Sequence, residues 1–151
     1  CIRDRTGTES YEAIKDMNLQ IAKIIAAETE VIAKEMNVKV VVCIAGKEGL
    51  PVLVEAMDDA FTISFRLAMK KAYTSAALKM ATHELDELTQ EGQELHGLSD
   101  MLEEEIVTLG GGYPIRVGNK TIGAIGISGS NVENDVNLAR KGALIIERME
   151  L

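Results

Sequence analysis

The chain has few of the residues that build cofactor cages and covalent frameworks. Its 151 residues include no tryptophan, and aromatic side chains make up only 3% of them, so a large aromatic cage is not expected. Two cysteines, Cys1 and Cys43, are too few for a disulfide framework or a cysteine zinc site. Cys43 lies in an apolar run, and we expect it in the core. The two histidines do not have the H-E-x-x-H spacing of a helical zinc site.

Basic charge is also scarce. The formal net charge is −8 at pH 7, whereas surfaces that bind nucleic acid or anionic lipid carry an excess of lysine and arginine. We therefore expect neither nucleic acid nor membrane as a partner. No apolar run approaches the roughly 18 residues that cross a bilayer. Residues 1–5 are mostly charged with no apolar segment behind them, unlike a secretory signal, which together with the unpaired thiols favours a cytoplasmic location.

The length suits one domain. Residues 1–7 have no apolar pattern, so we expect a short extension over 1–7 and a single domain over 8–151. Hydrophobic periodicity predicts a helix over 8–36, strands over 38–45 and 50–57, a helix over 60–81, a polar segment over 82–100, strands over 105–109, 113–117 and 120–128, and a last helix from about 130 to the C-terminus. Because hairpins dominate this order, we predict an α+β fold with an antiparallel sheet.

Two groups of glycines stand out. Gly110, Gly111 and Gly112 follow the first of the three late strands, where they form either a tight connection or a backbone wall against a flat or anionic ligand. Gly123, Gly126 and Gly129 do not have the spacing of a dinucleotide fingerprint. We expect the second group to thin the sheet where a helix crosses it.

A few polar residues are candidates for chemistry. Lys70 and Lys71 lie in a helix of small and apolar residues. Either they lie on its solvent-exposed side, or one of them faces Asp59, Asp135 or an anionic ligand. His83 and His96 lie in the coil-rich segment. Most such histidines are surface residues, but a neutral imidazole can also bind haem iron.

Several of these motifs occur together at a specific spacing. They are Met57-Asp58-Asp59-Ala60, Lys70-Lys71-Ala72, Gly110-Gly111-Gly112-Tyr113-Pro114, the run Ile122 to Gly129, and Val132-Glu133-Asn134-Asp135. Taken together they resemble the GlcG/HbpS-like domain, which is also found behind PduO-type corrinoid adenosyltransferases. The resemblance covers about residues 10–148.

The resemblance implies a profilin-like fold, with a five-stranded antiparallel sheet and helices on both faces, and a homo-oligomer of two or more copies. It also implies a small-molecule or tetrapyrrole ligand, bound beside the 110–114 loop and the lysine-bearing helix. Haem is the leading candidate for that ligand. Met57 and Phe65 are then candidates for the apolar wall. The candidate ligand-binding residues are Lys70, Lys71, Gly110, Gly111, Gly112, Tyr113, Pro114, Phe61, Glu133 and Asp135, and His83 and His96 are the candidate iron ligands.

Two other functions fit the same residues. One is an enzyme acting on a small metabolite, with Lys71 and Asp59, Glu133 or Asp135 as its acid–base set. The other is an assembly module, without a ligand of its own, in a glycolate or diol/glycerol utilisation system. The low aromatic content slightly favours these two over a haem protein.

Overall fold

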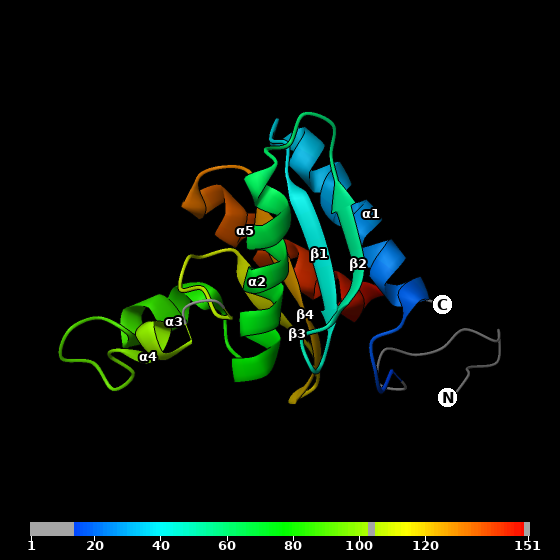
Figure 1. Ribbon diagram of the computed structural model, residues 1–151. Coiled ribbons are helices and arrows are strands. Elements are labelled where there is room, and N and C mark those ends of the chain that lie inside the picture. Colours follow the sequence, from blue (N-terminus) through cyan, green and yellow to red (C-terminus); the bar gives the residue numbers. More distant parts are fainter. Residues whose placement is uncertain (1–13, 103–104, 150–151) are drawn as a thin grey trace.

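The protein is a four-stranded antiparallel sheet with helices on both faces (Figure 1). The computed structural model describes residues 14–102 and 105–149. The sheet order is β2-β1-β4-β3, and all three neighbouring pairs are antiparallel. The elements are α1 (Leu19–Glu35), β1 (Val41–Gly46), β2 (Pro51–Ala56), α2 (Ile63–Leu78), α3 (Thr82–Leu88), α4 (Leu98–Met101), β3 (Gly112–Val117), β4 (Lys120–Ser128), α5 (Val132–Leu144) and the 3₁₀ turn η2 (Ile145–Arg148).

The two faces of the sheet have different coverings. Helices α1 and α5 pack on one face, and α2 packs on the other (Figure 1). Strand β1 contributes side chains to the hydrophobic cores on both faces of the sheet, because alternate side chains of a strand point to opposite faces. Val42 and Ile44 join the larger core with α1 and α5, whereas Val41 and Cys43 pack against α2. The predicted α+β class, the antiparallel sheet, the early hairpin and the core position of Cys43 are confirmed. Cys1 lies outside the described residues.

The first helix is shorter than the sequence predicts. It begins at Leu19, because the Asn18 side chain accepts a hydrogen bond from the Ile21 backbone N–H at 2.9 Å and caps the helix. Residues 14–18 are not helical, and residues 8–13 lie outside the described part of the chain. The helix ends just before Asn37, whose φ of 56° is the left-handed conformation that asparagine tolerates.

Helix α2 crosses β4 at very close range. A Cβ at Gly126 would collide with the backbone oxygen of Ala68 and lie 2.7 Å from the backbone nitrogen of Ala72. Only a glycine in the strand, facing small residues in the helix, permits this approach. The prediction that these glycines thin the sheet under a helix is therefore confirmed at Gly126.

The predicted five-stranded sheet is wrong, because residues 105–109 form no strand. Glu105 and Ile106 both donate from their backbone N–H to Leu102 O, which makes a turn. The backbone N–H of Val107 then donates to the Thr74 hydroxyl of α2 at 3.0 Å. These backbone donors are satisfied by a turn and a helix side chain, so this run pairs with no strand.

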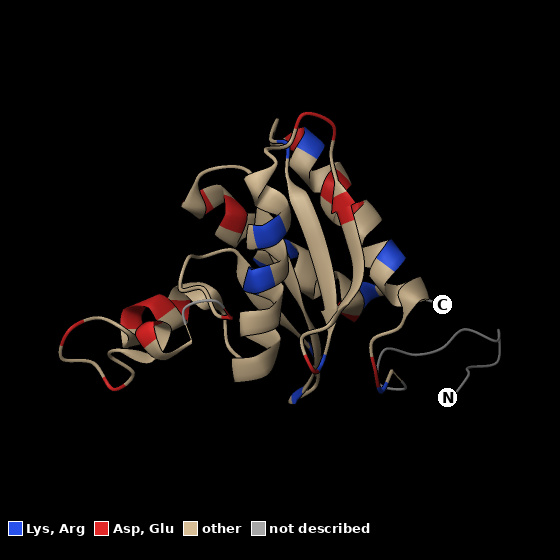
Figure 2. Cartoon of the chain, viewed as in Figure 1, with Lys and Arg blue, Asp and Glu red and all other residues tan. Residues whose placement is uncertain are grey.

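Residues 82–102 form a lobe that projects from the foot of α2 and carries α3 and α4 (Figure 1). We call it the acidic lobe. It contains no lysine or arginine, and its acidic residues are Glu84, Asp86, Glu87, Glu91, Glu94 and Asp100. Figure 2 shows this concentration of acidic residues. In the described residues no helix is both long and apolar enough to cross a membrane.

Candidate functional site: an apolar groove beside helix α2

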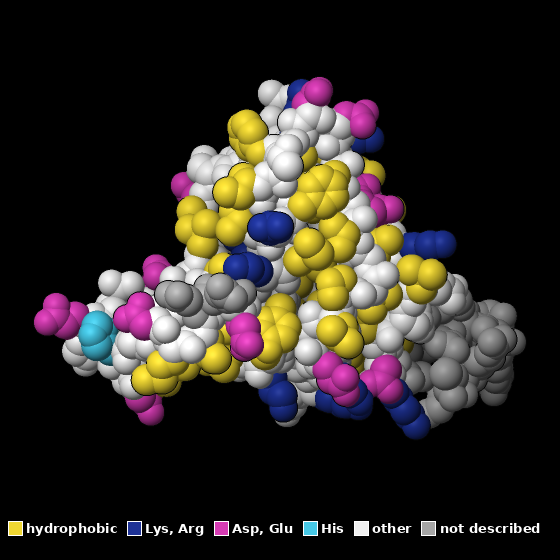
Figure 3. Space-filling model, viewed as in Figure 1, with side chains coloured by type: hydrophobic (Ala, Val, Ile, Leu, Met, Phe, Trp, Pro, Cys, Tyr) yellow, Lys and Arg dark blue, Asp and Glu magenta, His cyan; other side chains and the backbone are white. Residues whose placement is uncertain are grey.

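A shallow groove lies between α2 and the turn that joins β1 to β2. Its volume is about 380 Å³, and most of the surface that lines it is apolar. Figure 3 shows hydrophobic side chains on this side of α2. The lining residues are Gly49, Leu50, Pro51, Met69, Lys70, Tyr73 and Glu105.

The helical repeat and one glycine give the groove its shape. Met69 and Tyr73 are four residues apart, so they lie on the same side of α2 one turn from each other. The Tyr73 ring packs over Gly49, where an added Cβ would lie 2.5 Å from the ring. Gly49 also has a φ of 87°, which a glycine adopts without strain. Leu50 follows it and is 69% exposed, so the hairpin turn presents an apolar rim to solvent.

The exposed side of α2 is basic. The helix contains Arg66, Lys70 and Lys71 but no aspartate or glutamate. Arg66 and Lys70 are again four residues apart, so they lie on the same side of α2 one turn from each other, and Lys70 lines the groove. Figures 2 and 3 show positive charge on this helix. Glu105 is the acidic group at the groove's edge. This groove therefore combines an apolar wall with one cation, Lys70, and Arg66 lies one helical turn from that cation.

Lys71 points the opposite way and is fully buried. Its ammonium donates to Ile127 O at 2.8 Å and pairs with the Asp135 carboxylate at 3.3 Å. Burial lowers the pKa of Lys71 and raises the pKa of Asp135, while their mutual attraction opposes both changes. Of the three carboxylates that the sequence offers Lys71, the structure places only Asp135 beside it. Asp59 is exposed and pairs with Lys39 at 3.4 Å, and Glu133 is exposed on α5.

The glycine segment before β3 wraps around this buried pair. A Cβ at Gly111 would lie 2.9 Å from the Lys71 Nζ and 2.5 Å from Ile127 O. Gly111 O accepts from the Ile127 N–H at 2.8 Å, and the Gly112 N–H donates to the Thr82 hydroxyl at 2.9 Å. All three glycines are buried. The backbone of these glycines therefore lies close to other parts of the same protein.

The remaining predicted residues are spread over several places. Phe61 is 69% exposed and lines a different hollow with Lys39 and Ser130. Pro114 is buried in β3, and Tyr113 is half-buried with its ring centroid 6.3 Å from that of His83. Of the ten predicted ligand-binding residues, Lys70 lines the groove. Sequence reasoning missed the groove residues Gly49, Leu50, Pro51 and Tyr73.

The two histidines differ in environment. His83 is half-buried, and its Nδ1 is buried without a hydrogen-bond partner. His96 is exposed on the acidic lobe, with its Nδ1 3.3 Å from Thr89 O. Neither lines the groove. Across residues 14–102 and 105–149, no three His, Cys, Asp or Glu side chains are grouped to hold a metal ion.

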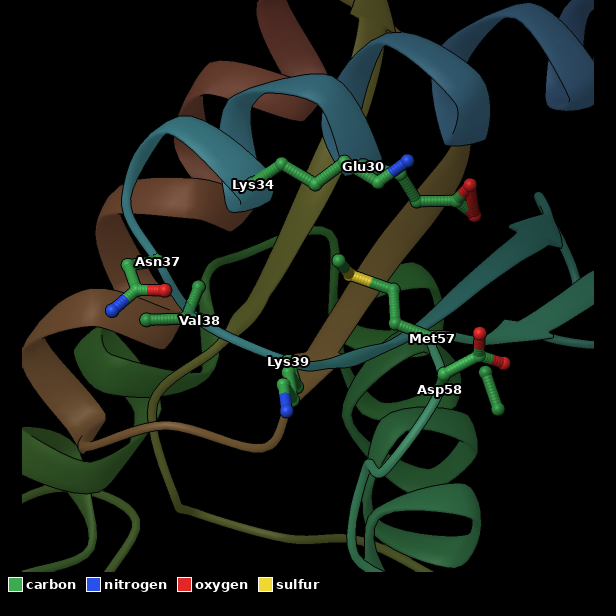
Figure 4. A pocket seen from close by; sticks show the side chains of 8 residues that line it. Glu30, Lys34, Asn37, Val38, Lys39, Met57 and Asp58 are labelled. Carbon is green, nitrogen blue, oxygen red and sulfur yellow. The ribbon is translucent and has the colours of Figure 1, made fainter.

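A second hollow of about 420 Å³ lies at the end of α1 (Figure 4). Its walls carry both signs of charge, from Glu30, Lys34, Lys39 and Asp58. Burial, with hydrogen bonding and repulsion from Glu55 of β2, raises the pKa of Glu30 to about 7, and Lys34 opposes the change. This carboxyl is therefore only partly ionised near neutral pH.

The fold and the groove define a small antiparallel α+β domain with an open, apolar groove beside a basic helix. The chain belongs to the HbpS-like family. The model of that family, described as haem degrading protein HbpS-like, matches residues 17–144. The resemblance inferred from the sequence motifs is therefore confirmed.

Three similar proteins show the range of the family. The chain is 40% identical to an uncharacterized 15.0 kDa protein of Citrobacter freundii from the dhaT-dhaS intergenic region, over 85% of this chain and 90% of that one. It is 43% identical to corrinoid adenosyltransferase PduO of Salmonella typhimurium, over 72% of this chain but only 32% of PduO. The solved PduOC:Heme complex superposes with a TM-score of 0.81 and 36% identity, over 87% of this chain and 95% of that one.

Proposed function

We propose that the protein binds haem in the groove between α2 and the β1–β2 turn. The observation that carries this proposal is the groove itself, where an apolar wall, the cation Lys70 and side chains able to ligate iron lie together. The family and the similar solved haem complex support haem as the ligand. A volume of about 380 Å³ falls in the range of small-molecule sites.

The apolar wall would contact one face of the macrocycle. Leu50, Pro51 and Met69 offer aliphatic and thioether surface, and the Tyr73 ring offers a flat one. Burial of such surface stabilises the complex by roughly 25 cal/mol for each Å² removed from water. The open groove loses part of this gain, because one face of a bound macrocycle would stay wet.

The cations would bind the two haem propionates. Lys70 lines the groove and Arg66 lies one helical turn from it, and charged hydrogen bonds to carboxylates are roughly twice as strong as neutral ones. Among the groove residues, the Tyr73 phenol and the Met69 thioether belong to the classes of side chain that hold haem iron. In this proposal Lys71, Asp135 and the glycines position α2 and do not touch the ligand.

The buried lysine pair does not favour the metabolite-enzyme alternative. The Lys71 side chain is 0% exposed and the Asp135 side chain 4%. A general acid or base must come within hydrogen-bond reach of its substrate, and these two groups are covered by protein. The homo-oligomer and the cytoplasmic location stay predictions.

A haem titration followed in the Soret region tests the proposal. We expect saturable binding by the natural sequence, and about tenfold or greater weakening in Leu50→Asp, which places a charge on the exposed apolar rim. Tyr73→Phe and Met69→Leu would show a changed Soret band if either side chain ligates the iron. Lys23→Glu, on exposed α1 surface across the sheet, is the control for a charge change elsewhere.

Two results would contradict the proposal. If the natural sequence showed no saturable Soret change, haem would not be the ligand. If Leu50→Asp bound haem as tightly as the natural sequence while Lys23→Glu did too, the groove would not be the site. Circular dichroism of each variant would confirm that it is folded.

A further inference from the structure

The hollow at the end of α1 is a second place where a small molecule can bind. Its walls come from the last turns of α1, the loop that leads into β1, and the end of β2 with the residues after it (Figure 4). It shares no lining residue with the groove beside α2. Its volume of about 420 Å³ lies in the range of small-molecule sites.

Glu30 is the unusual group on the wall of this hollow. Its Oε1 is buried without a hydrogen-bond partner, and a buried acceptor that has lost water without gaining a donor is unfavourable. Glu55 of β2 supplies a hydrogen bond only while the pair holds a proton, because two ionised carboxylates both accept. A ligand that donates a hydrogen bond to Glu30 would provide the missing partner.

Two lysines on the walls provide positive charge. Lys34 follows Glu30 by four residues on the same side of α1, and in Figure 4 its side chain extends along the helix toward Glu30. Within the part of the chain that the structure describes, Lys34 is in no ion pair. Lys39 lies before β1 and pairs with Asp59 at 3.4 Å, where both side chains are largely exposed. Both ammonium groups are therefore accessible to a ligand carboxylate.

The remaining wall is mostly apolar. Val38, Ala56 and Met57 line it, and Figure 4 shows the Met57 side chain directed from the end of β2 toward α1. An aliphatic group that packs on this surface is removed from water, which stabilises the complex. The hollow thus combines accessible cations, carboxyl acceptors and an apolar surface.

We propose that this hollow binds the zwitterion of an α-amino acid with an aliphatic side chain. Lys34 and Lys39 hold its carboxylate, Glu30 and Asp58 accept hydrogen bonds from its ammonium, and the side chain packs on Val38 and Met57. Charge-assisted hydrogen bonds of this kind are roughly twice as strong as neutral ones. The inference goes beyond the haem proposal and uses none of the groove residues.

This arrangement makes the affinity depend on pH. An ammonium is held best by the ionised form of Glu30, whose pKa burial and Glu55 raise to about 7 against the opposing effect of Lys34. Lys39 and Asp58 are the other charged groups on the wall. The ionised fraction of Glu30 falls from about nine-tenths at about pH 8 to about one-tenth at about pH 6, so the affinity should weaken up to about tenfold over that interval.

Isothermal titration of the full chain with L-leucine tests the inference. We expect saturable binding that is about tenfold weaker at about pH 6 than at about pH 8. The hydroxy-acid analogue of leucine, in which a hydroxyl replaces the ammonium, should bind more weakly and should not gain affinity as the pH rises. Glu30→Gln should bind leucine weakly at both pH values. Lys34→Met should weaken binding severalfold, whereas Lys141→Met, on exposed α5 surface, is the control for loss of a lysine elsewhere.

Three results would overturn the inference. The first is the absence of saturable leucine binding by the natural sequence. The second is binding of the hydroxy acid that matches leucine in affinity and pH profile, which needs no variant to measure. The third is a Glu30→Gln variant, folded by circular dichroism, that keeps the pH dependence of the natural sequence. The haem titration would be unaffected in each case, because its site has other residues.

Discussion

Replacement of Lys71 by methionine should strongly destabilise the protein. Methionine fills nearly the same volume but removes the charge that faces Asp135. The lysine is 0% exposed, and its ammonium contacts both Ile127 O at 2.8 Å and Asp135 at 3.3 Å. Without it, Asp135 keeps the Ser130 N–H at 3.1 Å but has no opposing charge. Breaking a buried ion pair on one side costs about 3–5 kcal/mol.

This loss is large compared with the free energy of unfolding of a typical domain. Native domains are stable by about 5–15 kcal/mol, so Lys71→Met should remove a substantial fraction. The measurement is equilibrium unfolding in urea, followed by circular dichroism at pH 7. The double variant Lys71→Met with Asp135→Leu should recover much of the loss, because replacing a whole buried pair by apolar groups is often close to neutral.

The pH dependence separates charge from packing. Asp135 in Lys71→Met has lost the cation that opposed the effect of burial, so its pKa rises further above the value in the unfolded chain. A carboxyl whose pKa is raised on folding contributes stability at low pH that is lost as the pH rises. The deficit of Lys71→Met against the natural sequence should therefore shrink on acidification. A loss below about 1 kcal/mol, or one independent of pH, would refute the reasoning.

Three further predictions concern packing, hydrogen bonding and pH. Gly126→Ala should cost about 1–3 kcal/mol or more in urea unfolding, because its Cβ would collide with α2. Thr82→Val should cost about 1–3 kcal/mol, because the buried Gly112 N–H loses its partner at 2.9 Å; an unchanged midpoint would contradict this. The carboxyl of Glu30 has a pKa raised from 4.5 to about 7 by burial and by Glu55, so its stabilising contribution should be present below pH 4.5 and fall away as the pH rises to about 7. Glu30→Gln should remove that slope from the difference in stability between variant and natural sequence, and equal pH profiles would contradict the assignment.

Much of the fold follows from local pattern. The β-branched run before the Gly46–Gly49 turn predicts a hairpin, and β1 and β2 form it. Small residues in α2 and the glycines of β4 predict a close crossing, which Gly126 makes. The strand predicted over 105–109 does not form, because a hydrogen-bond partner of this segment lies far away in the sequence. Its Val107 N–H donates to Thr74 on α2, and no local propensity reports that partner.

The candidate site shows where sequence reasoning stops. The motifs determine the family and single out Lys70, Lys71 and Asp135 as candidates. The two lysines are unusual because a charge in a helix of small and apolar residues needs a partner. Only the tertiary structure decides that the Lys71 side chain points into the protein while that of Lys70, one residue earlier, points outward. Adjacent helical residues point about 100° apart, so one position separates a buried ion pair from a groove rim. The groove is likewise a tertiary feature, because Gly49 and Tyr73 meet only when the hairpin turn packs against α2.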